Sequence, residues 1–158
     1  MSQETKKIAV FPGSFDPITV GHESIILRAL PLFDQIIVAV GVNATKSSMF
    51  SVDQRKHFIR KTFEGIEKIK VMEFSGLTVD FCKQQNARFI LRGLRTSADF
   101  EFERSIGQVN KILDEGIETV FMLTSTKHTP ITSSVVRDII RHHGNLEKLI
   151  PKAILKEF

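Results

Sequence analysis

A loop near the N-terminus combines residues that suit phosphate binding. It spans residues 11–22, contains two prolines and two glycines, and leads into a segment of helical periodicity. If Thr19 is the N-cap of that helix, Gly21 and His22 lie in its first turn, where unpaired backbone N–H groups and the helix dipole attract phosphate. A glycine inside a helix costs about 1 kcal/mol relative to alanine, so Gly21 indicates that a ligand comes close. A lone histidine is more often a packing residue, but these neighbours favour an anion site contacted by His22 and Ser14.

Two arginines follow the apolar residues 89–91, which are typical of a strand. Arg92 and Arg95 would then project from the carboxyl end of that strand, at the sheet edge that also holds His22. Guanidinium groups can donate paired hydrogen bonds to phosphate oxygens, and Gly93 lets the backbone approach a ligand. The competing interpretation is a pair of surface arginines that form ion pairs with nearby carboxylates, namely Asp99, Glu101 or Glu103. We favour phosphate binding for both arginines.

Lys46 lies in the loop after the second predicted strand. This loop lacks the second glycine of a P-loop and its spacing is one residue short, so a P-loop kinase or NTPase is excluded. A loop lysine is commonly just solvated, but a position at the carboxyl end of a strand favours contact with phosphate.

Three consecutive hydroxyl residues precede another apolar pattern of helical period: Thr132, Ser133 and Ser134. One of them is expected to be an ordinary N-cap. Three in a row exceed that need, and with the backbone N–H groups behind them they form a second predicted anion cradle.

These groups require a scaffold that brings them to one edge. Short runs rich in β-branched residues alternate with segments of helical period. Ser51 and Gln54 form a predicted capping box for the second helix. We predict strands at residues 7–11, 35–42, 69–74, 89–91 and 119–123, and helices at residues 22–32, 52–63, 78–85 and roughly 98–113, with two more after Ser133. The alternation predicts one α/β domain over residues 1–158, with a doubly wound parallel five-stranded sheet and helices on both faces.

The composition limits the class of protein. The chain has 158 residues, 42% of them hydrophobic and 25% charged, and no apolar run long enough to span a bilayer, so we expect no membrane insertion. A net charge of +4 suits an anionic ligand, but the absence of Trp, Tyr and zinc-finger spacing argues against a nucleic-acid partner. The N-terminus lacks the layout of a signal peptide, and the single cysteine, Cys82, cannot form a disulfide framework. These features predict a cytoplasmic protein, in which Cys82 is a packed thiol.

The motif Gly13-x-Phe15-Asp16-Pro17-x-Thr19-x-Gly21-His22 resembles the signature of nucleotidyltransferases that carry His-x-Gly-His or Thr-x-Gly-His. Its threonine variant resembles the phosphopantetheine adenylyltransferase branch. The resemblance continues, in the right order, through three further segments: Arg92-Gly93-Leu94-Arg95, Asp99-Phe100-Glu101-Phe102-Glu103 and Ile131-Thr132-Ser133-Ser134. It implies a Rossmann-like fold, the use of ATP with Mg²⁺, release of pyrophosphate, and a homo-oligomer that is commonly a hexamer.

The same resemblance implies roles for individual residues. The residues implied to bind ATP are Ser14, Phe15, His22, Gly93, Leu94, Arg95, Glu103, His128, Thr129, Pro130, Ile131, Thr132, Ser133 and Ser134. Those implied to bind the acceptor, 4′-phosphopantetheine, are Ser14, Lys46, Leu77, Thr78 and Arg92. The chain departs from the pattern at Gly76, where aspartate is common, and at Thr132, where serine is commoner.

The residues favour catalysis without a covalent enzyme intermediate. The acceptor phosphate is already ionised, so it can attack the α-phosphorus of ATP directly and give dephospho-coenzyme A. We expect His22, Lys46 and Arg95 to stabilise the developing charge and Ser14 to orient phosphate. Since no carboxylate cluster suggests a metal cage, Mg²⁺ is expected to arrive with ATP.

Other activities stay open from the sequence. One is transfer to nicotinamide mononucleotide, with which Arg137, three residues after Ser134, is compatible. A second is cytidylyl transfer to a phosphorylated alcohol. A third is a module that binds a nucleotide or coenzyme without turnover.

Overall fold

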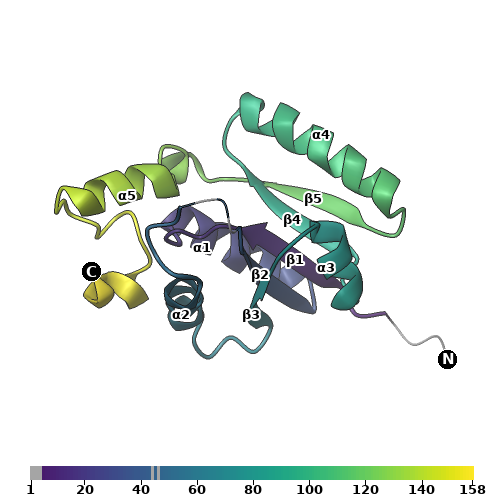
Figure 1. Ribbon diagram of the computed structural model, residues 1–158, viewed down its shortest axis with the longest axis horizontal. Coiled ribbons are helices and arrows are strands. Elements are labelled where there is room, and N and C mark those ends of the chain that lie inside the picture. Colours follow the sequence, from purple (N-terminus) through teal and green to yellow (C-terminus); the bar gives the residue numbers. More distant parts are fainter. Residues whose placement is uncertain (1–4, 44, 46) are drawn as a thin grey trace.

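A five-stranded sheet forms the centre of the computed structural model, which describes residues 5–43, 45 and 47–158 (Figure 1). The strands are β1 (Ile8–Gly13), β2 (Gln35–Gly41), β3 (Ile69–Phe74), β4 (Phe89–Leu94) and β5 (Glu118–Leu123). They lie in the order β3-β2-β1-β4-β5, and every neighbouring pair is parallel. The strand order therefore reverses direction between β1 and β4, which is where ligands bind in doubly wound folds.

Helices cover both faces of this sheet, as the sequence predicts. The α-helices are α1 (Val20–Ala29), α2 (Val52–Thr62), α3 (Thr78–Gln84), α4 (Ser97–Leu113) and α5 (Ser133–Arg141). Short 3₁₀ helices are η1 (Leu30–Leu32), η2 (Thr126–His128) and η3 (Lys152–Glu157). The predicted capping box of α2 is confirmed, because Ser51 and Gln54 each bond the backbone N–H of the other. None of the described helices is long and apolar enough to cross a membrane.

The core consists of two layers, one on each side of the sheet, because alternate residues of a strand point to opposite faces. Phe11 of β1 and Val38 of β2 pack with α1 and α2 on one side, while Val10 and Ile37 pack with α3 on the other. Helix α4 covers the same side of the sheet as α3. Its Gly107 packs against Thr119 of β5, because a Cβ at Gly107 would lie 3.2 Å from Oγ1 of Thr119. Thr119 pairs with Ile90 of β4, which is buried in the layer that α3 covers. The helices thus enclose β1 and β2 on both sides.

Most element boundaries lie within one residue of the prediction, and the larger differences are at β1, β4 and α1. Strand β1 ends at Gly13, two residues later than predicted. Strand β4 continues three residues beyond the predicted Leu91, so Arg92 lies within the strand and does not follow it. Pairing with β5 extends it, and this tertiary pairing overrides the low strand propensity of glycine. Helix α1 begins at Val20, two residues earlier than predicted, and its α-helical part ends at Ala29, after which a 3₁₀ turn contains Pro31.

Candidate active site

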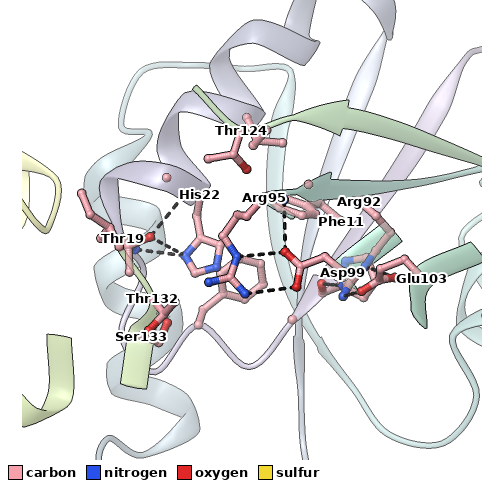
Figure 2. Close-up of a pocket in the computed structure, with 17 residues that line it drawn as sticks. Phe11, Thr19, His22, Arg92, Arg95, Asp99, Glu103, Thr124, Thr132 and Ser133 are labelled. Carbon is pink, nitrogen blue, oxygen red and sulfur yellow. Dashed lines mark hydrogen bonds and ion pairs between the residues drawn. The ribbon is translucent and has the colours of Figure 1, made fainter. Parts of the chain in front are cut away.

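A pocket of about 240 Å³ lies at the carboxyl ends of β1 and β4, at the point where the strand order reverses. The β1–α1 loop forms one wall, the end of β4 and the start of α4 form another, and the N-terminus of α5 closes a third side (Figure 2). Nine of the predicted site residues line it: Phe15, His22, Arg92, Gly93, Arg95, Glu103, Ile131, Thr132 and Ser133. The fold therefore brings together three segments that are far apart along the chain.

His22 is held by a capping box at the start of α1. Thr19 is the N-cap, and its hydroxyl accepts the backbone N–H of His22 at 3.4 Å. In return, Nδ1 of His22 accepts the backbone N–H of Thr19 at 3.0 Å. A neutral imidazole that accepts through Nδ1 carries its proton on Nε2, so the free ring nitrogen is a hydrogen-bond donor.

The surroundings of His22 keep the ring uncharged. Burial, together with the positive charges of Arg92 and Arg95, lowers the pKa of His22 to about 4. The ring also packs edge-on against Phe15, with ring centroids 5.0 Å apart. At neutral pH His22 is therefore a rigid, neutral donor.

The glycines at the end of β1 and in the first turn of α1 have two different explanations. A Cβ at Gly13 would lie 3.0 Å from the ring of Phe15, so that glycine is required by packing within the loop. A Cβ at Gly21 would meet nothing closer than the Thr19 hydroxyl at 3.4 Å, so the protein itself leaves room there. The glycine at position 21 thus fits the predicted close approach of a ligand.

Arg92 is paired with Glu103 across the pocket wall (Figure 2). Its Nε and Nη2 atoms donate to the two carboxylate oxygens of Glu103, which is only 8% exposed, and its Nη1 atom donates to the carbonyl of Pro12 at 2.6 Å. Arg92 thus forms one of the ion pairs named as the competing interpretation. A guanidinium has five N–H donors, so the three hydrogen bonds still leave two donors for a ligand.

Arg95 forms a more exposed ion pair than Arg92 does. Its Nε atom lies 3.2 Å from Oδ2 of Asp99, and both side chains are about one-third exposed. Asp99 also accepts the backbone N–H of Thr96, the N-cap of α4, so its main structural role is to start that helix. A partly exposed ion pair of this kind contributes about 0–1 kcal/mol, so Arg95 can exchange its carboxylate partner for phosphate at little cost.

The three hydroxyls before α5 have three separate partners. Thr132 is the N-cap, with its hydroxyl accepting the N–H of Val135 at 3.1 Å. Ser133 donates to the carbonyl of Pro17 at 2.9 Å, and Ser134 accepts from Arg137 at 3.1 Å. Thr132 and Ser133 line the pocket, whereas Ser134 is exposed beside it.

Several other predicted residues lie outside this pocket. Ser14 is exposed between two lining residues, Leu94 has a buried side chain, and Leu77 is 56% exposed at the N-cap of α3. Thr129 and Pro130 belong to the turn between η2 and α5 and do not line the pocket, and Lys46 lies outside the described residues. The pocket therefore contains most of the residues predicted to bind phosphate, but few of those predicted to bind the acceptor.

Thr78 and His128 lie in neighbouring hollows. Thr78 lines a pocket of about 180 Å³ that shares Pro12, Arg92 and Glu103 with the first pocket. His128 lines a groove on the outer side of α1, and its buried Nδ1 atom has no partner among the described residues.

The sequence matches a known family over most of its length. The family model described as Cytidylyltransferase-like matches residues 10–139. The phosphopantetheine adenylyltransferase of Christiangramia forsetii is 54% identical over 151 residues, which cover 96% of this chain and 99% of that protein. The enzyme of the same name from Flavobacterium johnsoniae is 56% identical over 146 residues, covering 92% and 95%. The chain belongs to the phosphopantetheine adenylyltransferase family.

Solved structures of other adenylyltransferases share its fold. A putative nicotinate-nucleotide adenylyltransferase from Vibrio parahaemolyticus superposes with a TM-score of 0.70 at 17% identity, covering 96% of this chain and 97% of that chain. A bifunctional NMN adenylyltransferase/ADP ribose pyrophosphatase from Francisella tularensis gives 0.73 at 14% identity, covering 94% and 46%. These likenesses confirm the Rossmann-like fold expected for a phosphopantetheine adenylyltransferase.

In this member of the phosphopantetheine adenylyltransferase family, Gly76, which we expected to be a departure from the family pattern, lies between β3 and α3. Gly76 has a φ of +81°, in the left-handed region that favours glycine, and a Cβ there would meet no atom within 4 Å. Backbone conformation, and not crowding, therefore accounts for glycine at this position.

The sequence also contains a positioning residue that its motifs did not indicate, Arg55 of α2. It is 4% exposed and donates to the carbonyl oxygens of Ser14 at 2.7 Å and Phe50 at 3.2 Å. It holds the β1–α1 loop against the start of α2. Helical periodicity could have revealed it, because Arg55 shares a face with the buried Phe58 and Ile59.

Proposed function

We propose that the chain transfers the adenylyl group of ATP to the phosphate of 4′-phosphopantetheine, giving dephospho-coenzyme A and pyrophosphate. The observation that carries this proposal is the convergence of the neutral donor His22 with Arg92 and Arg95 on one pocket at the reversal of strand order. The acceptor is suggested by relatives named phosphopantetheine adenylyltransferase at 44–56% identity. The neighbours named for nicotinate or NMN are only 14–17% identical and carry no argument about substrate.

The geometry supports a direct displacement. An oxygen of the acceptor phosphate attacks the α-phosphorus while the bond to the bridging oxygen of the β-phosphate breaks, and that electron pair leaves with pyrophosphate. The Nε2–H group of His22 donates to a non-bridging α-phosphate oxygen, on which charge increases during transfer. Arg95 and the first turn of α5 stabilise the leaving phosphates.

The two neighbouring pockets support an orientation for the acceptor. They share Arg92, whose two free N–H donors can bind the acceptor phosphate. The smaller pocket continues past Thr78 and Ile106, so it offers an apolar and polar lining for the pantetheine arm. Ser14, Lys46 and Leu77 stay assigned to the acceptor side by resemblance alone.

Mg²⁺ is proposed to enter with the nucleotide. Among the described residues, no group of three or more His, Cys, Asp or Glu side chains could hold a metal ion. The carboxylates at the pocket, Asp99 and Glu103, are each paired with an arginine. This donor set fits a hydrated Mg²⁺ bound mainly by phosphate oxygens, where it would neutralise phosphate charge. A related structure from Francisella tularensis is described as a complex with AMP and a Mn ion.

Assembly and location are further parts of the proposal. Helix α4 exposes several apolar side chains, including Phe102 at 67% and Ile112 at 80%, and such a face favours contact between copies of the chain. A homohexamer is the assembly implied by the family. The cytoplasm is the proposed location, in keeping with the single cysteine, Cys82, which cannot form a disulfide framework.

An acceptor screen tests the proposal. Purified protein is incubated with ATP, Mg²⁺ and one acceptor at a time, and pyrophosphate is measured. We expect release with 4′-phosphopantetheine and none when ATP, Mg²⁺ or the acceptor is omitted. Turnover with nicotinamide mononucleotide in its place would overturn the acceptor, and tight nucleotide binding without turnover of any acceptor would indicate a sensor module.

A further inference from the structure

Asp16 lies at the junction of three segments: the β1–α1 loop, the segment before α2 and the start of α5. It is 4% exposed, and its two carboxylate oxygens accept the backbone N–H groups of Met49 and Phe50, each at 2.9 Å. Hydrogen bonds to an ionised acceptor are stronger than neutral ones. Asp16 therefore attaches the segment that follows β2 to the β1–α1 loop.

Arg137 connects the same residue to α5. Its Nη1 atom donates to the backbone carbonyl of Asp16 at 2.8 Å and lies 3.8 Å from the Asp16 carboxylate. Its Nη2 atom donates to the hydroxyl of Ser134 at 3.1 Å. The adjacent hydrogen bond from Ser133 to Pro17 reinforces the connection. Arg137 is not among the residues that line the pocket, and its Nη1 and Nη2 atoms donate to Asp16 and Ser134.

The segments joined in this way belong to the two sides of the proposed reaction. Thr132 and Ser133, at the start of α5, line the nucleotide side of the pocket. Met49 lies three residues along the chain after Lys46, which the family resemblance assigns to the acceptor and which lies outside the described residues. In-line transfer depends on the separation of the two reacting phosphates, and a misplacement of about 1 Å can cost about 10²-fold in rate.

We propose that Asp16 and Arg137 form a strut that sets the spacing between the acceptor side and the nucleotide side of the site. Both are positioning residues, and Arg137 acts through Asp16 and Ser134, not as a ligand of the ATP phosphates. The proposal rests on the adenylyl transfer proposed above.

Substitutions in α5 separate positioning from phosphate binding. Arg137→Gln should lower kcat at least about tenfold while the Kd for ATP stays within about threefold, because spacing and not nucleotide affinity is lost. Arg137→Lys should recover only part of the rate, since it keeps a positive charge near Asp16 but cannot replace both guanidinium donors. Arg141→Gln, an exposed position in the last turn of the same helix, is the matched control and should change neither value. If Arg137→Gln weakens ATP binding tenfold or more with kcat unchanged, Arg137 is a phosphate ligand and the strut is wrong.

A double-mutant cycle tests whether the two residues act together. Once Asp16→Asn has been made, adding Arg137→Gln should lower kcat by no more than about twofold. The reason is that asparagine cannot accept the N–H groups of both Met49 and Phe50, so the strut is already broken at that end. Fully additive losses would mean that the two residues act independently. If Asp16→Asn does not fold, the cycle is run with Ser134→Ala, which removes the other partner of Arg137.

A third measurement is independent of turnover. Hydrogen exchange of the Met49 and Phe50 amides should accelerate at least about tenfold in Arg137→Gln relative to the parent and to Arg141→Gln. Unchanged exchange would overturn the strut even if the variant is slow. Failure of the proposed function would be seen separately, as a parent protein that releases no pyrophosphate with any acceptor.

Discussion

The Nδ1 atom of His22 accepts the backbone N–H of Thr19 at 3.0 Å, and this bond joins helix capping to the chemistry of the site. It completes the capping box that starts α1 and, at the same time, fixes the ring proton on Nε2. A substitution at His22 therefore removes a cap and a donor together. Separating the two effects requires a control that removes a cap elsewhere.

His22→Ala should keep its fold and bind ATP within about tenfold of the parent while kcat falls about a hundredfold or more. The donor acts on charge that grows in the transition state, so its loss affects kcat more than ground-state affinity. Circular dichroism, ATP titration and steady-state rates on one preparation provide the measurement. Gln54→Ala is the control, since Gln54 occupies the same position in the capping box of α2. A nearly unchanged kcat would make His22 a packing or capping residue only.

The lowered pKa of His22 predicts a specific dependence of stability on pH. The unfolded chain binds a proton at His22 near pH 6.5, whereas the folded protein does so only near pH 4. Between these values the unfolded state holds more protons, so stability falls as the pH decreases. From pH 7 to pH 5, His22 should account for a loss of about 2 kcal/mol in the free energy of unfolding.

Urea unfolding at both pH values measures this loss. His22→Gln lacks the titrating ring, so the pH-dependent loss should be about 2 kcal/mol smaller in that variant than in the parent. Equal losses in the two proteins would show that His22 is accessible and protonates normally. The kcat of the parent should show no titration of His22 between pH 6 and pH 8.

The parts of the fold that local patterns specify were predictable. The β-branched runs of β2, β3 and β5 gave correct element types, and the capping residue Ser51 gave the correct start of α2. The N-cap at Thr19 is also observed, although the range predicted for the first helix began two residues late. The end of β4 was not predictable, because Arg92 and Gly93 interrupt the apolar pattern and only pairing with β5 keeps them in the strand. Local sequence does not report that pairing.

The candidate site also has parts that local sequence specifies and parts that only tertiary packing specifies. The position of His22 follows from the N-cap at Thr19 and the first helical turn after it, so it could be predicted from the sequence. The partner of Arg92 depends on how α4 packs against β4, which places Glu103 and not Glu101 beside the guanidinium. Asp16 belonged to the recognised motif, but its hydrogen bonds to Met49 and Phe50 join residues more than thirty positions apart. Contacts over such separations come from the tertiary structure alone.

Arg92→Ala should raise the KM of the acceptor at least about tenfold more than that of ATP. The reason is that alanine cannot replace the two N–H donors proposed to bind the acceptor phosphate. Steady-state kinetics with each substrate varied in turn measure both constants. Arg104→Ala serves as the control, because Arg104 pairs with Glu101 on the exposed side of α4. An unchanged acceptor KM would reduce Arg92 to a structural partner of Glu103.

Arg55→Ala should lower the free energy of unfolding by about 3 kcal/mol. The substitution removes a buried guanidinium and leaves the carbonyl oxygens of Ser14 and Phe50 without their donor, and hydrogen bonds to charged groups contribute about 1.5–3 kcal/mol each. Arg60→Ala, at an exposed position of the same helix, should change stability by less than about 0.5 kcal/mol. Urea unfolding at pH 7 measures both variants. Because Arg55 holds the β1–α1 loop, the acceptor KM should also rise in Arg55→Ala under conditions where the variant is fully folded. A stability loss with unchanged kinetics would show that Arg55 supports the fold but does not position the site.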